Sequence, residues 1–348
     1  MTIDAFAEAE RLVDEVGPRP PGSDAERRAA KLLTGRLEEL GREVVTEPFP
    51  VWPSWATGYA INAGIAIAGS VLAVSSAVLG TALVLVAAIL TFLDLSGISP
   101  TTRRLLGRRA SQNVISWGDR EREGHLFLVA HYDSGPARTR PLRPMFLALL
   151  VLLACCVLRV AGMEGVAITI VQFIPTVALI LYVAALLDLA LSAPAAGEND
   201  NASGVALALK LADRLGTELE YFSVHVLLTG SQKAMAQGMR AFLRAHKKEL
   251  PRSDTVFINL HAVGAGDIGP ATKEGPLLAA RGHAALLAQA DAETTTTSRE
   301  PSDGYAAASA GFPAITITGE GERLEEEALA AAEELAVRIA QGIDEELS

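Results

Sequence analysis

The sequence predicts a mixed α/β fold with a mostly parallel central sheet, into which four apolar helices are inserted as two hairpins. Short β-branched runs alternate with helical stretches in three parts of the chain, which is typical of α/β domains. Two long runs with almost no charge separate these parts, and half of all residues are apolar. We therefore expect one discontinuous domain made of residues 1–56, 97–143 and 193–348, with hairpins at 57–96 and 144–192.

The first part of the chain has the features of folded-domain sequence. Residues 1–16 carry acidic groups at helical spacing and lack the apolar core of a signal peptide. A turn rich in proline and glycine follows at 17–22, and Ser23 or Asp24 can cap a helix that runs to about Leu40. The run 43–51 is a strand candidate. This part thus predicts two helices followed by a strand.

The first apolar run, 58–95, carries no charge before Asp94. At a rise of 1.5 Å per residue, roughly 37 helical residues could cross a hydrocarbon core of about 30 Å twice. We therefore expect a tight helical hairpin with its bend around Ser75, Ser76 and Gly80.

The second apolar run, 145–192, is interrupted by Arg159, Gly162, Glu164 and Gly165. The interruption predicts a second hairpin, and Arg159 and Glu164 are expected to face water at its tip rather than to form a polar relay. The alternative is two pairs of helices buried in a soluble core. Because uncharged runs of this length exceed what a globular helix needs, four membrane spans are the preferred interpretation.

Charge predicts how these spans are oriented. Nine arginines lie between the two hairpins, whereas the predicted tips carry only Arg159. The positive-inside rule therefore places the soluble domain and both termini in the cytoplasm. The nine are Arg103, Arg104, Arg108, Arg109, Arg120, Arg122, Arg138, Arg140 and Arg143.

Composition and spacing also indicate partners. The apolar runs make a lipid bilayer the expected surrounding of the hairpins. Ala60, Gly64 and Ala68 recur every four residues, so a homo-oligomer formed through these helices is one expectation. The net charge of -11 opposes nucleic-acid binding, because phosphate contacts require clustered Lys and Arg.

Five short apolar runs are expected to form the sheet, and helices lie between them. The strand runs are 112–117, 125–130, 223–229, 255–260 and 313–318, and the helical stretches lie around 202–215, 234–249, 275–291 and 324–345. Ligands of such sheets gather beyond the carboxyl ends of the strands. His131 and Asp133 follow the second run, and residues 231–233 follow the third. His261 follows the fourth, so we expect these polar groups to meet in one crevice.

Two fragments carry a more specific signal, LFLVAHYD at 126–133 and ENDNASG at 198–204. They resemble the metal-binding loops of the co-catalytic zinc aminopeptidases of metallopeptidase family 28, which include bacterial leucyl aminopeptidases. The resemblance implies a zinc-aminopeptidase-like α/β sandwich. It also implies that His131 binds a first metal, that Asp133 orients this histidine and that Asp200 bridges two metals. Imidazole and carboxylate ligands suit Zn²⁺, and an outer carboxylate fixes the imidazole tautomer.

The chain departs from the family pattern at the next motif. After a strand that ends in Gly, the family places two Glu residues, the general base and then a ligand of the second metal, and here these positions are Gln232 and Lys233. Glutamine cannot accept and return a proton, and an ammonium cannot ligate zinc. The family's final metal-binding His, expected after 313–318, is also missing. The second zinc site is therefore predicted to be lost.

One zinc site could survive in altered form. The family has an Asp after the strand that corresponds to 255–260, and this chain has His261 there. His131, Asp200 and His261 then offer two imidazoles and one carboxylate, with an open position, to a single Zn²⁺. The alternative is that His261 only caps a strand and that Asp200 pairs with Lys233, whose charge would replace part of that of the lost metal.

Three functions are compatible with these features. The favoured one is a membrane-anchored aminopeptidase homologue with a degenerate dizinc site, catalytically impaired or inactive, which binds a peptide or protein partner as a scaffold. The alternative is an active single-zinc aminopeptidase or related hydrolase in which Glu198 or Asp133 moves the proton. The third is a transport unit, and the small number of polar residues in the apolar runs argues against it.

Overall fold

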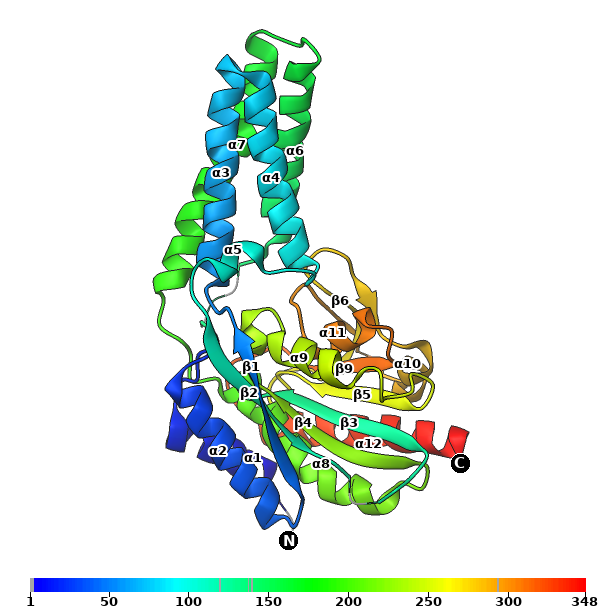
Figure 1. The fold of residues 1–348 in the computed structure, drawn as a ribbon. Coiled ribbons are helices and arrows are strands. Elements are labelled where there is room, and N and C mark those ends of the chain that lie inside the picture. Colours follow the sequence, from blue (N-terminus) through cyan, green and yellow to red (C-terminus); the bar gives the residue numbers. More distant parts are fainter. Residues whose placement is uncertain (1–2, 119, 137, 139, 293) are drawn as a thin grey trace.

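The computed structural model describes residues 3–118, 120–136, 138, 140–292 and 294–348, which fold around one mixed sheet with helices on both faces (Figure 1). The described residues form nine strands in the order β1, β2, β4, β3, β5, β9, β6, β7, with β8 paired to β6. The strands are β1 (Val44–Val51), β2 (Arg109–Ser116), β3 (Gly124–His131), β4 (Phe222–Thr229), β5 (Thr255–Leu260), β6 (Gly269–Glu274), β7 (Ala280–Arg281), β8 (Thr296–Ser298) and β9 (Ala314–Thr318).

The four central strands, β4, β3, β5 and β9, run parallel and are almost fully buried. The flanking pairs β1–β2, β2–β4 and β6–β9 are antiparallel. Edge strand β1 contains Pro48 and Pro50, which are tolerated because the outer side of an edge strand needs no N–H donor. The prediction of a parallel sheet centre is confirmed, and antiparallel strands extend it on both sides.

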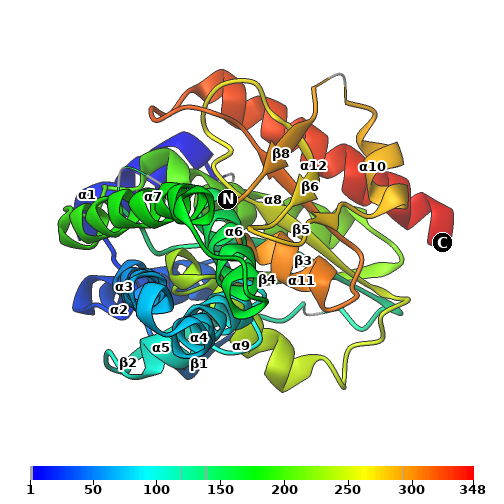
Figure 2. The ribbon, with the colours of Figure 1, turned by 90° about the horizontal axis from the view of Figure 1, so that it is seen from above.

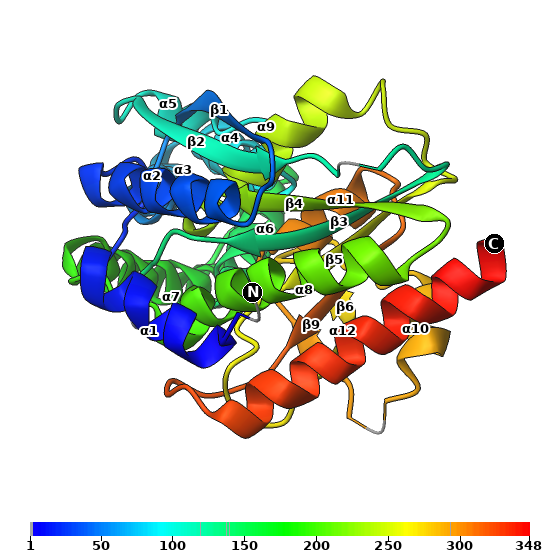
Figure 3. The same cartoon turned by 90° about the horizontal axis from the view of Figure 1, so that it is seen from below.

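Two helix layers cover the sheet (Figure 3). Along β3, Leu126 and Leu128 join the core under the first layer and Phe127 and Val129 join the core under the second, as the period of two in a strand requires. The predicted sandwich is therefore confirmed. The first layer contains α1 (Ala5–Val16), α2 (Asp24–Glu39), α8 (Gly204–Glu218) and α12 (Glu326–Leu347), and the second contains α9 (Gln237–His246) and α11 (Asp303–Ser309).

Four apolar helices form a bundle that extends away from the sheet (Figures 1 and 2). All four are long and apolar enough to cross a membrane. Large apolar side chains on the outside of the bundle, such as Val71, Phe173 and Leu181, are 66–67% exposed. So extensive an apolar surface is unusual for a protein surrounded by water. The helices of this apolar bundle are α3 (Trp55–Ser75), α4 (Ala77–Leu95), α6 (Arg143–Val160) and α7 (Val166–Leu191).

The first hairpin differs from its prediction in one detail. Gly80 lies inside α4 rather than in the bend, and a side chain there would come within 2.4–2.5 Å of Ala73 on α3. Ala60 is buried in the core of the bundle, whereas a Cβ at Gly64 would have nothing within 4 Å and Ala68 is exposed. The homo-oligomer expected through these residues stays a prediction.

Gly80→Leu is expected to loosen this hairpin, because the new side chain would overlap the backbone of Ala73. Overpacking of this kind costs about 1–3 kcal/mol. The loss is measured as a lower apparent melting temperature of the protein in detergent. Gly64→Leu adds the same side chain where there is open space and serves as the control. Equal melting temperatures for the two variants would contradict the close packing at Gly80.

Arg159 contradicts the expectation that it faces water. Its guanidinium donates to Gln172 Oε1 at 2.5 Å and to Thr169 Oγ1 at 2.7 Å, and the residue is 9% exposed. Gln172 in turn donates to Ser70 on α3, whereas Glu164 is exposed as predicted. A cation among apolar helices requires polar partners, and these lie on other helices, where a local pattern cannot reveal them.

The helix predicted around 275–291 is wrong in its first half. β6 is followed there by the short strand β7, and only α10 (Ala284–Ala290), at the end of the range, is helical. Gly275 has a φ of 124°, a conformation that glycine adopts readily and other residues avoid. The turn at Gly275 and Pro276 therefore outweighs the apolar spacing that favoured a helix.

Arg103, in the short helix α5 (Thr101–Arg104), connects the apolar bundle to the sheet. Its guanidinium donates to both carboxylate oxygens of Asp94, at 2.8 and 2.5 Å, and to the carbonyls of Trp52 and Ala234, each at 3.0 Å. The side chains of Arg103 and Asp94 are only 3% and 6% exposed. Because Ala234 directly follows Lys233, this buried ion pair connects the end of α4 with the loop after β4. Arg103 is therefore a structural residue as well as one of the nine arginines counted for orientation.

Candidate metal centre

Three polar side chains meet beyond the carboxyl ends of the parallel strands. His131 is the last residue of β3, His261 follows β5, and Asp200 lies in the loop before α8. One ligand atom of each residue lies within 4.8 Å of the others. Since β3 and β5 are neighbours in the sheet, the two imidazole rings lie side by side with their centres 5.2 Å apart. The structure thus brings together the three residues that the sequence suggested for one metal.

His131 is held on both ring nitrogens. Its Nε2 lies 3.0 Å from Asp200 Oδ1, and its Nδ1 lies 3.1 Å from the Asp133 carbonyl and 3.3 Å from Asp133 Oδ1. Burial opposes a charge on this ring, but the bonds to Asp133 and Asp200 outweigh it and raise the pKa of His131 to about 9. Asp133 therefore orients the imidazole, and Asp200 presents a carboxylate oxygen to its ligand nitrogen.

The loop that carries Asp200 is fastened to the segment that carries His261. Asn201 Nδ2 donates to the Leu260 carbonyl at 2.8 Å, and Asn201 Oδ1 accepts the Ala262 N–H at 2.9 Å. These bonds fix Asp200 relative to His261. This role of Asn201 could not be predicted from the sequence, because its partners lie 59 and 61 positions further along the chain.

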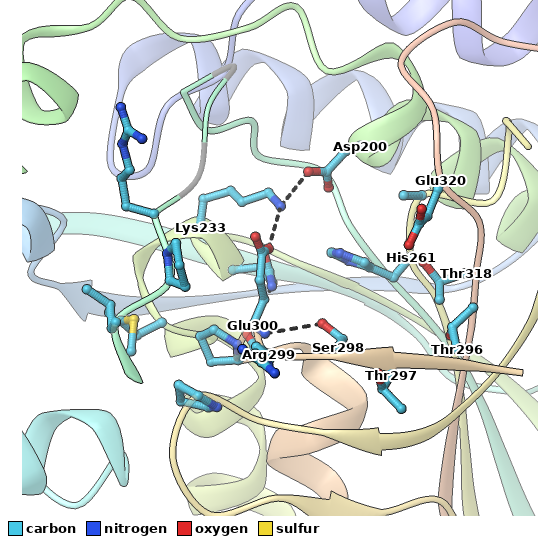
Figure 4. A pocket seen from close by; sticks show the side chains of 18 of the residues that line it. Asp200, Lys233, His261, Thr296, Thr297, Ser298, Arg299, Glu300, Thr318 and Glu320 are labelled. Atoms are coloured by element: carbon cyan, nitrogen blue, oxygen red, sulfur yellow. Dashed lines mark hydrogen bonds and ion pairs between the residues drawn. The ribbon is translucent and has the colours of Figure 1, made fainter. Parts of the chain in front are cut away.

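Lys233 lies directly beside Asp200 (Figure 4). Its Nζ is 2.5 Å from Asp200 Oδ2 and 3.9 Å from Glu300 Oε2. Burial opposes the ammonium charge, but Asp200 and Glu300 outweigh it and raise the pKa of Lys233 above its ordinary value. Desolvation likewise opposes the charge of Asp200, and Lys233 and His131 outweigh it, so the pKa of Asp200 is well below its usual range. The pairing of Asp200 with Lys233 that the sequence left as an alternative is therefore present.

Gln232, at the general-base position, is bonded to a neighbouring loop. Its Nε2 donates to the Pro301 carbonyl at 3.0 Å, and its Oε1 has no partner within the described part of the chain. The backbone N–H groups of Gln232 and Lys233 donate to the Asp133 carboxylate at 2.9 and 2.8 Å. Asp133 thus holds this loop as well as His131. An amide does not titrate near neutral pH, so Gln232 cannot relay a proton.

These residues fit one metal ion. Asp200 turns Oδ1 toward His131 and Oδ2 toward Lys233. The Nδ1 atom of His261 is buried without a hydrogen-bond partner among the described residues, and burial lowers the pKa of His261 to about 3, so its lone pair is free. Two imidazoles and one carboxylate are a donor set that Zn²⁺ accepts with a fourth position open. His131, Asp200 and His261 could therefore hold one zinc ion, with an ammonium at the other carboxylate oxygen.

A cavity of about 590 Å³ opens in front of this centre. Strand β8 and the loop 299–301 that follows it line the cavity together with Trp55 and Leu142, which lie at the base of the apolar bundle. Glu300 and Glu320 also line the cavity (Figure 4). Neither carboxylate was predicted from the sequence, because both lie in loops that carry no motif. The cavity thus offers apolar surface and charged groups to a ligand.

Two buried charged residues from the first part of the chain support the centre. Arg19 is fully buried and donates to the Tyr132 carbonyl at 2.8 Å. Glu26 accepts the N–H and the hydroxyl of Ser231, at 2.7 and 2.8 Å. Burial, followed by the nearby Asp133, raises the pKa of Glu26 to about 8. The sequence predicted only a turn and a helix here, since Tyr132 and Ser231 lie more than 100 positions from these two residues.

Glu274, buried beside the loop that carries Glu300, is expected to make stability depend on pH. It accepts the hydroxyls of Ser302 and Thr316, each at 2.7 Å, and burial raises its pKa from 4.5 to about 7. A carboxyl group whose pKa is higher in the folded protein than in the unfolded chain stabilises the fold while it is protonated. This stability is fully present below its pKa in the unfolded chain and is lost as the pH rises through its pKa in the folded protein. Between about pH 5 and pH 8, the apparent melting temperature should therefore fall less in Glu274→Gln than in the wild type. Glu10→Gln, at an exposed position, is the control, and identical pH profiles for all three proteins would contradict this role.

Comparison with known proteins agrees with this geometry. The model of peptidase family M28 matches residues 113–334, which is more than half of the chain. A similar solved structure is the zinc aminopeptidase BSAP from Bacillus subtilis, with 14% identity, a TM-score of 0.54, and 97% of this chain and 93% of that chain covered. Comparison with curated protein sequences gave no significant match.

Two further solved structures have the same fold. One is a glutaminyl cyclase from Bacteroides thetaiotaomicron bound to N-acetylhistamine, with 14% identity, a TM-score of 0.55, and 97% and 98% of the two chains covered. The other is a Zn-dependent exopeptidase from Parabacteroides distasonis, with 15% identity, a TM-score of 0.55, and 96% of each chain covered. At these identities the likeness shows the fold alone. The family match, however, spans the strands and loops that carry all three candidate ligands, and the chain therefore belongs to peptidase family M28.

Proposed function

We propose that this protein is a membrane-anchored M28-type metallopeptidase homologue that holds one zinc ion and binds the amino terminus of a peptide, with its hydrolytic step impaired. One observation carries the proposal. The ammonium of Lys233 lies 2.5 Å from Asp200 Oδ2, on the carboxylate that two metals would otherwise share. Membership of family M28 supports a metallopeptidase-like function, and the donor set of His131, Asp200 and His261 supports a single ion.

We expect impaired hydrolysis because the described residues of the metal centre lack a side chain that can act as the general base. A bound zinc ion would supply Lewis-acid chemistry, but a side chain must still accept and return a proton. The amide of Gln232 cannot do so, and Lys233 remains an ammonium at neutral pH because its pKa is raised. Asp133 is occupied by two backbone N–H groups and by His131. Glu198, suggested by the sequence, is exposed and is not among the described residues that line the cavity.

The cavity has features suited to a peptide with a free amino group. Glu300 and Glu320 place two carboxylates in its wall, and Trp55 and Leu142 add apolar surface. A protonated amine next to carboxylates gains charge-assisted hydrogen bonds, and apolar side chains gain from burial. Aminopeptidases among the solved structures of the same fold support an amino terminus as the bound group.

Binding without turnover is the direct test. The full chain, purified in detergent and loaded with zinc, should bind a short peptide with a free amino terminus and bind the N-acetylated peptide about tenfold more weakly. The amino-terminal residue should not be released at ordinary enzymatic rates, which are roughly 10 s⁻¹. Rapid release that is lost in Asp200→Ala would overturn the proposal of impaired hydrolysis. Equal, weak binding of both peptides would overturn the proposed ligand.

The membrane part of the proposal depends on the apolar bundle and the arginines. Four helices of sufficient length and apolarity support anchoring, and the excess of arginines between the hairpins supports a cytoplasmic soluble domain. The protein should remain in the membrane fraction after alkaline extraction. A reporter fused after Ser348 should be active only on the cytoplasmic side, and activity only on the opposite side would reverse the orientation.

A second function is favoured by one specific contact. Glu300 Oε2 lies 3.9 Å from Lys233 Nζ in the wall of the same cavity, so a carboxylate from another loop comes close to the metal ligands. In a single-zinc hydrolase this side chain would accept the proton that Gln232 cannot. Measurable hydrolysis that is abolished in Glu300→Gln and retained in Glu322→Gln, at an exposed position, would select this function.

A further inference from the structure

A second cavity of about 250 Å³ adjoins the first at the base of the apolar bundle. Trp55, Pro136 and Lys233 line both cavities, so these three residues form a common wall. The second cavity is also lined by the first turn of α3 and by Leu189 and Ala190 in the last turn of α7. It therefore extends from the candidate metal centre to the ends of two apolar helices.

The walls of the second cavity are rich in proline. Proline has a locked φ angle and no N–H group, which reduces the number of conformations open to the wall. The stem of Lys233 packs closely on its neighbour, since a side chain at Gly135 would lie 3.1 Å from Lys233 Cγ. Five prolines line this cavity, Pro20, Pro21, Pro53, Pro136 and Pro194.

The charges of the second cavity select its occupant. Among the described residues that line it, the charged ones are Arg109 and Lys233, and both are cations. The first cavity contains the carboxylates of Asp200, Glu300 and Glu320 beside the cations of Arg140, Lys233 and Arg299, so acidic groups occur only in the first cavity among the described lining residues. A chain with a positive amino group at one end and a neutral or acidic continuation would complement both cavities.

The far end of the second cavity lies at the boundary of the apolar bundle. Leu187 and Leu191, in the last turns of α7, are 44% and 87% exposed. In a membrane-anchored protein these side chains lie at the lipid boundary. A chain that leaves the cavity at Leu189 and Ala190 is therefore already at the membrane surface.

We infer that the two cavities form one groove, which takes the amino-terminal segment of a polypeptide that is itself inserted in the membrane. The inference rests on the proposed function, and it adds the class of partner. The free amino terminus lies in the first cavity, and a short neutral or acidic segment passes Lys233 and Trp55 and fills the second. The partner's transmembrane helix follows directly.

Anchored probes test this inference. Each probe is a transmembrane helix preceded by five residues, which span about 17 Å when extended, with a photoreactive group on the first residue. With the full chain in phospholipid vesicles, a probe with an acidic segment should crosslink to the first cavity. A basic segment should reduce the yield about tenfold.

Groove-filling variants sharpen the test. Ala190→Trp, at an exposed position in the wall of the second cavity, should reduce crosslinking of the acidic probe about tenfold and leave zinc content unchanged. Ala184→Trp, also exposed on α7 but outside both cavities, is the matched control. Thr57→Trp, in the part of the wall that α3 forms, provides a second filling variant if Ala190→Trp does not fold.

The outcomes separate this inference from the proposed function. If wild type binds soluble peptides and neither filling variant changes crosslinking of the anchored probe, the groove inference is wrong and peptide binding stands. If wild type binds neither soluble nor anchored peptides, the proposed function fails. If a filling variant displaces a phospholipid detected by native mass spectrometry but leaves crosslinking of the probe unchanged, the occupant of the second cavity is a lipid and the polypeptide is excluded.

Discussion

Asp94→Asn is expected to lower the free energy of unfolding by about 3–5 kcal/mol, because it leaves the buried guanidinium of Arg103 without a counter-charge. The effect should extend to the metal centre. Arg103 also donates to the Ala234 carbonyl, next to Lys233, so a displaced guanidinium loosens the loop after β4. We expect lower stability in detergent, measured by denaturant unfolding, together with weaker zinc binding, measured by competition with a chelator.

Two further variants define the origin of this effect. Asp188→Asn removes an exposed carboxylate near the end of α7 and should change neither stability nor zinc binding. Asp94→Leu combined with Arg103→Met replaces the ion pair by apolar side chains. Because such a replacement often leaves the free energy of unfolding unchanged, the double variant should regain much of the stability that Asp94→Asn loses. If Asp94→Asn alone has no effect, Arg103 does not connect the bundle to the metal centre in the way that its contacts indicate.

Zinc-loaded protein is expected to contain one metal ion per chain, and His131→Ala or His261→Ala is expected to remove it. Loss of an outer partner of a ligand typically costs about 10–100-fold in affinity, so loss of a ligand should cost more than about 100-fold. Asp133→Asn should weaken zinc affinity by only about 10–100-fold, because Asp133 contacts the ligand His131 and not the metal. Elemental analysis and chelator competition measure both quantities.

His283→Ala is the matched control for the histidine variants, since His283 is exposed and lies outside the candidate centre. Its metal content should equal that of the wild type. Two ions per chain would contradict the role assigned to Lys233. Its ammonium is paired with the Asp200 carboxylate oxygen that a second ion would need as a ligand. A metal content that survives in both His131→Ala and His261→Ala would move the site elsewhere.

Much of the architecture could be predicted because its signals are local. Continuous apolar runs at 125–130 and 255–260 marked two central strands, and the start of α2 was marked by two candidate caps, of which the structure uses Ser23. Predictions failed where a tertiary contact outweighed the local pattern. Gly80 packs against Ala73 instead of forming the bend, and the turn at Gly275 interrupts a stretch whose spacing favoured a helix.

The candidate site shows the same division. His131 and His261 could be expected in one crevice because the carboxyl ends of parallel strands meet at one edge of the sheet, and their rings lie 5.2 Å apart. The position of Glu300 could not be predicted, because this residue lies in a loop whose path depends on contacts such as the hydrogen bond from Gln232 to Pro301. No spacing rule brings that carboxylate within 3.9 Å of Lys233.

The sequence by itself determined which strands form the sheet centre, which runs form the apolar helices, and which residue types stand at the strand ends. Each of these depends on side chains within a few positions of one another. Only the tertiary structure decided that Arg159 and Arg103 are buried and that Lys233 bonds Asp200. A charge leaves water only where partners from distant segments compensate it, and those partners are assembled by folding rather than by neighbouring sequence.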